Sequence, residues 1–287
     1  MMRNKLLSAT TALCLMSSAA TAGSLSNVFA DNVFSEATDV VGDLMDTLMP
    51  GVTNFRLGLG PVVSTEYEGG NKYDVSIAPL ISLRYKNLVE VDNNQVRVNL
   101  FGEKGAIWES SHFRAGPTLK IDFGRSEKDS LDLKGLGNVG TSFELGAFAS
   151  YTNGPMRYRA RVRQDVASGH KGMLSDLDVS LAVFRTKTVT VGSRLGTTWA
   201  SKKYMTSYFG VNATQARASG LPVYTAGSGI KDVSLSLGGE VKLAERWAVV
   251  INGGYQRLLS KAKSSPIVAL RGSANQLSFG AYAAYAF

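Results

Sequence analysis

Residues 277–287, at the end of the chain, alternate between two kinds of side chain. Counting back from Phe287, every second position is apolar or aromatic, and the positions between them are mostly small or polar. The apolar set is Leu277, Phe279, Ala281, Ala283 and Tyr285. A strand with this period presents one face to an apolar environment and the other to a wetter one. The pattern fits either a half-buried strand of a soluble sandwich or a strand of a membrane barrel.

The same two-residue period recurs over most of the chain, from Phe55 onward. Its segments are about ten residues long, the length that a tilted strand needs to cross the hydrocarbon layer. The clearest are 73–85, 95–100, 113–123, 141–151, 176–183, 188–197, 232–243 and 247–256. Tyrosine and tryptophan fall near the segment ends, as in the aromatic girdles of membrane proteins. The sequence therefore predicts an all-β fold, an antiparallel transmembrane β-barrel of about twelve strands over 55–287, with one N-terminal amphipathic helix. Segments 105–109 and 266–271 fit this pattern least well.

The first 22 residues have the pattern of a secretory signal peptide. Arg3 and Lys5 provide a positive start, residues 6–16 are mostly apolar, and small residues precede a cleavage site near Ala22. The single cysteine, Cys14, lies inside this segment, so we expect a mature chain with neither disulfides nor thiolate metal sites. Export followed by barrel formation predicts the outer membrane of a Gram-negative cell as the location.

The segment between the signal and the barrel, 23–54, breaks the two-residue period. Within it, residues 31–49 place apolar side chains at three- and four-residue spacing, and Pro50 and Gly51 follow. This spacing predicts an amphipathic helix. Such a helix could pack on the periplasmic rim or in the barrel mouth, or it could act as a plug or a partner-docking element.

Five longer polar connections separate the predicted strands, at 64–72, 125–139, 167–175, 212–230 and 259–274. With both termini in the periplasm, loops 212–230 and 259–274 fall outside the cell, where long loops are usual. The same alternation places 125–139 on the periplasmic side, where short turns are expected. Either a pair of strands escapes detection or the periplasmic side is unusually elaborate.

One predicted strand carries an arginine at every second position. Facing lipid, each arginine would cost about 2–4 kcal/mol near the bilayer midplane, so we expect this face to line the lumen. The arginines are Arg157, Arg159, Arg161 and Arg163, and the carboxylates expected to face them are Glu144, Asp176 and Asp178. These seven residues form either a structural salt-bridge network or an anion-attracting constriction.

Several functional classes lack support in the sequence. The 31 Lys and Arg exceed the 23 Asp and Glu only mildly, and they are too dispersed to predict nucleic-acid binding. The two histidines, His112 and His170, are far apart, and His170 lies in a polar stretch that is typical of a solvated loop. No catalytic, cofactor or metal motif is present. We therefore predict a protein that is not an enzyme, with no cofactor and no metal.

Several stretches resemble a family of outer-membrane proteins. The most specific run is 199–229, which contains Tyr208-Phe209-Gly210-Val211 and the segment 219–224. Residues 67–85 and 135–139 fit as well, as do 255–258, 265–268 and the closing residues. Together they resemble the MipA/OmpV family, also called the MltA-interacting protein family, over most of 55–287. The predicted helix 31–49 lies outside the matched part.

The resemblance implies a function in the cell envelope. It suggests a non-enzymatic barrel, seated in outer-membrane lipid, that acts as a scaffold for peptidoglycan remodelling. Its implied partners are a periplasmic murein lytic transglycosylase and a penicillin-binding protein, and the family provides no catalytic residues to carry over. The alternatives are a small-bore channel or porin with a basic lumen and an adhesin-like surface protein.

Overall fold

The computed structural model describes residues 52–104 and 106–287. The predicted signal peptide and the predicted helix 31–49 lie outside the described residues. The long strands are β1 (Val52–Thr65), β2 (Tyr73–Tyr85), β7 (Phe113–Asp122), β8 (Ser142–Asn153), β9 (Met156–Asp165), β10 (Met173–Arg185), β11 (Val189–Ala200), β12 (Gly229–Lys242), β13 (Trp247–Leu258) and β14 (Asn275–Ala286). Short strands are β3 (Val89–Asp92), β4 (Gln95–Val98), β5 (Phe101–Gly102) and β6 (Trp108–Glu109).

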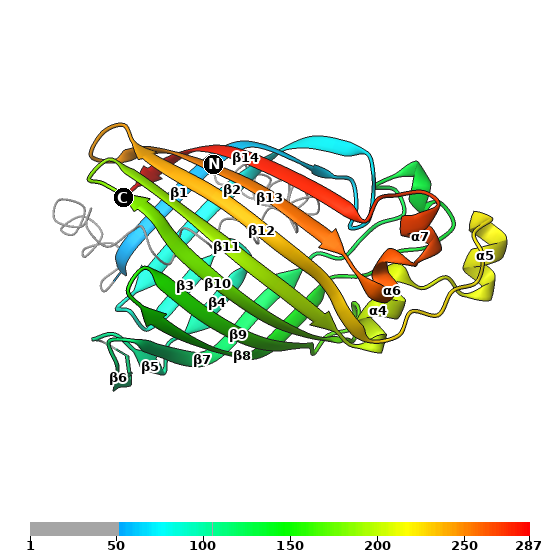
Figure 1. Cartoon of the computed structure of the whole chain (residues 1–287), viewed down its shortest axis with the longest axis horizontal. Coiled ribbons are helices and arrows are strands. Elements are labelled where there is room, and N and C mark those ends of the chain that lie inside the picture. Colours follow the sequence, from blue (N-terminus) through cyan, green and yellow to red (C-terminus); the bar gives the residue numbers. More distant parts are fainter. Residues whose placement is uncertain (1–51, 105) are drawn as a thin grey trace, which may run out of the picture.

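The strands close into a cylinder. Each of β7 to β13 pairs with the next strand of the chain, β14 pairs with β1, and β1 to β4 continue the sheet until β4 meets β7. Every one of these pairings is antiparallel. The result is a closed barrel of 12 strands, with β5 and β6 attached outside it beside β7 (Figure 1). The predicted transmembrane barrel is therefore confirmed.

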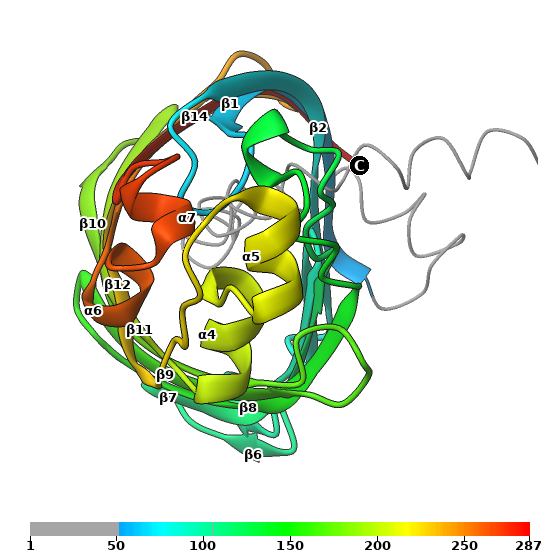
Figure 2. The same cartoon turned by 90° about the vertical axis from the view of Figure 1, so that its right-hand side faces the viewer.

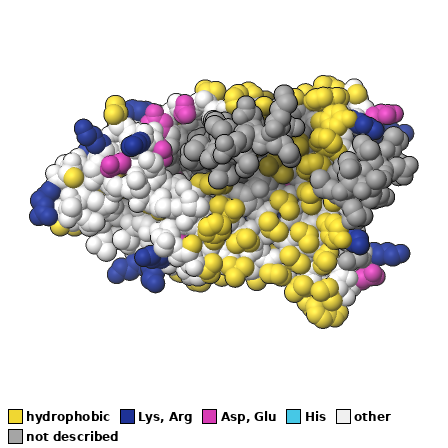
Figure 3. Space-filling model, turned by 180° about the vertical axis from the view of Figure 1, so that it is seen from behind, with side chains coloured by type: hydrophobic (Ala, Val, Ile, Leu, Met, Phe, Trp, Pro, Cys, Tyr) yellow, Lys and Arg dark blue, Asp and Glu magenta, His cyan; other side chains and the backbone are white. Residues whose placement is uncertain are grey.

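The two faces of the wall differ as the alternation predicts. On β12, Val233, Leu235 and Leu237 point outward and are 38%, 45% and 55% exposed. The neighbouring Asp232 and Glu240 point inward and are buried. Figure 3 shows outward apolar side chains gathered over the middle of the barrel wall on the face drawn. An apolar outer band and a polar interior are the arrangement of an outer-membrane barrel.

The terminal strand seals the cylinder with aromatic contacts. β14 pairs with β1 from Val63↔Phe279 to Arg56↔Ala286. The backbone N–H of Phe287 donates to the carbonyl of Phe55 at 3.0 Å, and the two rings stack at 5.0 Å. Aromatic pairs of this kind add about 0.5–1.5 kcal/mol beyond the area they bury. The end of the chain therefore fastens the closing seam.

The barrel end opposite Phe287 carries a cap. It contains the 3₁₀ turn η1 (Leu131–Leu133) and the helices α4 (Lys202–Phe209), α5 (Ala213–Ser219), α6 (Ser260–Lys263) and α7 (Pro266–Ala269). Viewed along the barrel, these elements lie across its mouth (Figure 2). Among the described residues, no helix has the length and apolar character needed to cross a membrane.

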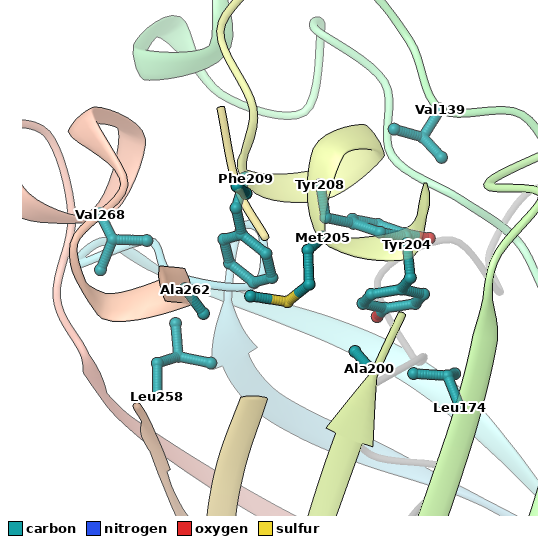
Figure 4. Packing of buried hydrophobic residues seen from close by; sticks show 11 residues of the cluster. Val139, Leu174, Ala200, Tyr204, Met205, Tyr208, Phe209, Leu258, Ala262 and Val268 are labelled. Atoms are coloured by element: carbon teal, nitrogen blue, oxygen red, sulfur yellow. The ribbon is translucent and has the colours of Figure 1, made fainter. Parts of the chain in front are cut away.

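The cap has its own hydrophobic core, built around α4. Met205 and Phe209 are fully buried and pack against Leu258 at the end of β13 and against Ala262 and Val268 of the β13–β14 connection (Figure 4). A second cluster joins Leu133 and Leu136 of the β7–β8 loop to Leu221 of the β11–β12 connection and Ile267 of the β13–β14 connection. Because loops far apart in sequence share these clusters, the cap is a packed unit.

One expected loop position was wrong. The β7–β8 connection, which contains 125–139, lies at the capped end together with 212–230 and 259–274. The error arose at β3, whose four residues are too few to be recognised from alternation, whereas β4 lies inside the predicted segment 95–100. Segment 105–109 contributes only β6, outside the cylinder, and segment 266–271 forms α7.

The closing seam provides a test of the fold. A Cβ atom at Gly60 of β1 would lie 1.8 Å from the carbonyl oxygen of Ala281 on β14, whereas one at Gly253 of β13 would have no atom within 4 Å. We expect Gly60→Ala to prevent most of the chain from folding into a heat-resistant barrel, because backbone atoms at the seam must move apart. Gly253→Ala is the matched control and should fold as the native chain does. Migration of unheated and heated samples on denaturing gels measures the folded fraction, and equal folding of both variants would contradict this packing.

Candidate functional site

The lumen is the candidate site, and the arginine strand β9 runs along its wall. Arg157, Arg159 and Arg163 are 6%, 5% and 4% exposed, whereas Tyr158 between them is 44% exposed on the outer face. The structure thus turns all four arginines inward, in the register that the cost of lipid exposure requires.

We call Arg157, Arg159, Arg161 and Arg163 the arginine ladder. Carboxylates from the neighbouring strands face this ladder. Arg163 contacts Glu144 of β8 and lies 2.6 Å from Asp176 of β10. Arg161 Nε lies 3.4 Å from Asp176, and Arg159 Nε lies 3.6 Å from Asp178. Strand register explains these contacts, because Asp176 pairs directly with Arg161, and Asp178 with Arg159. The structure therefore places Arg159, Arg161 and Arg163 in ion pairs with Glu144, Asp176 and Asp178.

Arg157 Nε donates to Thr152 Oγ1 at 3.2 Å. Additional charged residues, which the sequence reasoning did not single out, extend the network. Arg194 of β11 lies 3.7 Å from Asp178, and Arg56 of β1 lies 2.6 Å from Glu240 of β12. They occupy inward positions of their strands, so the two-residue period was the signal that could have revealed them.

His170 is buried, and its expected place in a solvated loop was wrong. It is 1% exposed, its Nδ1 accepts from the Gly172 N–H at 3.0 Å, and its Nε2 lies 3.0 Å from Glu144 Oε1. The ring also stacks edge-on against Tyr204 of α4, with centroids 4.8 Å apart. The β9–β10 loop folds into the cap, which a single sequence does not reveal.

Three potential metal ligands come together near His170. Ligand atoms of Asp122, Glu144 and His170 all lie within 4.8 Å of one another. Each group already has partners: Tyr208 donates to Asp122 at 2.9 Å, and Glu144 is held between Arg163 and the His170 ring. A divalent ion could bind only by displacing these contacts, so we assign the cluster to the junction between barrel and cap.

Two further contacts fasten the cap to the lumen. Glu68, in the β1–β2 loop, contacts Lys231 of β12 and accepts from the Tyr204 hydroxyl at 3.3 Å. Arg125 Nη1 donates to the Tyr208 carbonyl oxygen at 2.8 Å. Burial and the neighbouring Asp122 carboxylate raise the pKa of Tyr208 well above its usual range. The Tyr208 hydroxyl therefore stays protonated and remains a donor.

A polar cavity of about 200 Å³ lies between the ladder and the cap. Its charged lining consists of Lys120, Arg161, Arg163, Arg194 and Lys231 together with Glu68, Asp122, Asp176, Asp178 and Asp232. Cations and carboxylates are equal in number, so the cavity has no strong preference for anions by formal charge. The expected basic character of the lumen is thus local to the β9 face.

The best-paired arginine provides a test of the network. Arg163→Gln leaves Glu144 and Asp176 buried without their shared cation, and breaking a buried ion pair from one side costs about 3–5 kcal/mol. We expect that loss in the free energy of unfolding, measured by urea titration in lipid vesicles. Arg217→Gln, on the exposed face of α5, is the control and should change stability by less than about 0.5 kcal/mol. Similar values for both variants would show that the ion pairs do not stabilise the barrel.

Solved structures similar to this chain include outer-membrane proteins at low sequence identity. A structure described as KdgM porin is 10% identical, with a TM-score of 0.42, covering 81% of this chain and 99% of that chain. A bacterial polysaccharide outer membrane secretin is 9% identical, with a TM-score of 0.44, covering 81% and 98%. The COG4313 outer membrane channel from Pseudomonas putida F1 is 11% identical, with a TM-score of 0.40, covering 83% and 96%.

No curated protein matches the chain. A family model does: the model described as MltA-interacting protein MipA matches residues 57–287, which is nearly the whole barrel. The match begins within β1 and continues to the last residue of the closing strand. It agrees with the resemblance seen in the sequence, and the chain belongs to the MltA-interacting protein MipA family.

Proposed function

We propose that this barrel is a non-enzymatic outer-membrane scaffold that holds murein-remodelling enzymes at the membrane. The family description names an interaction with MltA. The proposed partners of this chain are a periplasmic murein lytic transglycosylase and, through it, a penicillin-binding murein synthase. The capped end then faces outward, because long connections of outer-membrane barrels lie outside the cell and short turns in the periplasm.

The observation that favours a scaffold over an open diffusion pore is the filled interior. The cap packs as a unit with its own core, and the ladder below it is engaged in ion pairs. Buried arginines that already have carboxylate partners bind a passing solute only by breaking those pairs. A barrel closed in this way presents its outer surfaces, rather than its lumen, for function.

The periplasmic end offers a docking surface made of β5, β6 and the start of β7. Phe101 stacks on Trp108 with ring centroids 4.8 Å apart and meets Phe113 at 6.1 Å. Trp108 is 54% exposed and Ile107 60% exposed. β5 continues from β4 along the edge of β7, and β6 pairs with β5, so this aromatic projection extends the sheet at that end of the barrel (Figure 1). Exposed aromatic side chains that cluster in this way are typical anchors of protein interfaces.

A paired substitution tests the scaffold. Trp108→Ala should weaken capture of a purified murein lytic transglycosylase by the detergent-solubilised barrel at least about tenfold, as loss of an interface anchor does. Trp247→Ala is the matched control: that side chain is 50% exposed and stands on β13, at the same end of the barrel. It should leave capture unchanged.

Two results would count against the scaffold. If the native barrel captures no murein enzyme from a periplasmic extract, the proposed partners are wrong. If both tryptophan variants lose capture equally, the aromatic projection acts only as a membrane-interface anchor, like Trp247.

A small-bore channel is the second candidate, and the charged cavity favours it. The cavity lies inside the barrel, next to the arginine ladder of β9, and is lined by polar groups from six or more strands. A pore through it would be lined by charged side chains that include Arg161 and Asp232. Charged rings of this kind select ions in known pores.

Planar-bilayer recording separates the two candidates. A channel predicts a steady current, with an ion selectivity that shifts toward cations when Arg159→Gln and Arg161→Gln are combined, because both positive charges then leave the lumen. A scaffold predicts no steady current through the native barrel. A conducting barrel whose ion selectivity is the same with and without the two arginines would rule out the constriction.

A further inference from the structure

The exposed surface of the cap is strongly one-sided in charge. In the described loops of the capped end, the exposed cations are Lys72, Lys128, Lys134, Lys171, Lys202, Lys203, Arg217, Lys261 and Lys263. Asp129 is the one exposed carboxylate in the same loops. Figure 3 shows Lys and Arg side chains at this end, beyond the apolar band, with Asp and Glu side chains among them on the face drawn, and Lys72 pairs with Asp132 at 2.7 Å. A surface of this kind attracts anionic partners, and the attraction weakens as salt rises.

Three of these lysines form one group at the rim, above β9, β10 and β11. Lys171 lies in the β9–β10 loop, and Lys202 and Lys203 begin α4. The two segments are in contact: a Cβ atom on Gly172 would lie 2.4 Å from the backbone nitrogen of Tyr204. Tyr204 points into the cap core, whereas all three lysines are exposed. We call Lys171, Lys202 and Lys203 the rim lysines.

The rim lysines stand just beyond the edge of the apolar band. Trp199, on β11, faces outward in register with Ser175 of β10 and Ile230 of β12. Ile230 is 48% exposed and Val166, next to the end of β9, is 62% exposed. Tryptophan at a strand end marks the level where hydrocarbon gives way to headgroups. The chain continues from Trp199 directly to Lys202, so the rim lysines lie at the headgroup level.

We propose that the rim lysines bind the phosphate groups of anionic lipid headgroups in the leaflet around the capped end. The two backbone segments in contact bring three positive charges to one part of the rim, which matches a phosphorylated headgroup in charge, and the Trp199 edge below them accommodates its acyl chains. Lysine binds phosphate as a compact point charge and needs no fixed geometry. The site is independent of whether the barrel acts as a scaffold or a channel.

The test compares lipid binding by the detergent-solubilised, folded barrel, measured by native mass spectrometry. The probes are a bisphosphorylated glycolipid and the same glycolipid without its phosphates. Near an anionic surface each lysine contributes about fivefold in affinity, so we expect the combined Lys171→Gln, Lys202→Gln and Lys203→Gln variant to bind the phosphorylated probe at least about tenfold more weakly. Its affinity for the dephosphorylated probe should stay that of the native protein.

The matched control removes three exposed lysines from the opposite end, Lys86, Lys104 and Lys187, each changed to Gln. It should bind both probes like the native barrel, and heat-modifiable migration should show that both triple variants are folded. An equal loss in the control, or no loss in the rim variant, overturns the proposal. Displacement of the phosphorylated probe by millimolar inorganic phosphate would also overturn it, because the site would then be one for free anions.

Discussion

The need to satisfy every backbone polar group within lipid determines this structure. In hydrocarbon, an unpaired N–H or C=O has no water to bond, so strands can cross only if the sheet has no free edge. Here β14 closes on β1 and β4 closes on β7. The stacking of Phe55 on Phe287 and the absence of a side chain at Gly60 let the seam form at backbone distance. Side-chain alternation follows, because each strand then has one face in lipid and one in the lumen.

The filled lumen is a second consequence of closure. Inward positions cannot reach lipid, so they accept charged residues that the outer face excludes. Strand register then decides which charges meet: Asp176 pairs with Arg161, and Asp178 with Arg159, across β10 and β9. The same interior receives the cap, where Tyr204 and Tyr208 hydroxyls bond to Glu68 and Asp122. Barrel and cap are therefore joined by charged contacts below and by an apolar core above.

Much of the wall could be predicted from the sequence, because the two-residue period is a local property. The outward face of β12 and the inward face of β9 follow from the alternation and from the cost of arginine in lipid. The cap could not be predicted in the same way. Its core joins Met205 to Val268 and Leu133 to Ile267, contacts between loops that no local period specifies. The burial of His170 has the same cause, since the β9–β10 loop is ordered by α4. β3 has only four residues and was not recognised, so loop 125–139 was assigned to the wrong side of the membrane.

A cysteine scan along β12 tests most directly whether this alternation faces lipid. The single cysteine of the chain is Cys14, so the chain from residue 23 onward contains none and each new one is unique. Nitroxide labels at successive positions 232–237 would be measured in lipid vesicles for collisions with oxygen, which concentrates in hydrocarbon. A barrel in lipid requires high collision rates at Val233, Leu235 and Leu237 and low rates at the positions between them. Equal collision rates along the strand, with the protein folded and monodisperse in buffer without detergent, would contradict the placement of this face in lipid.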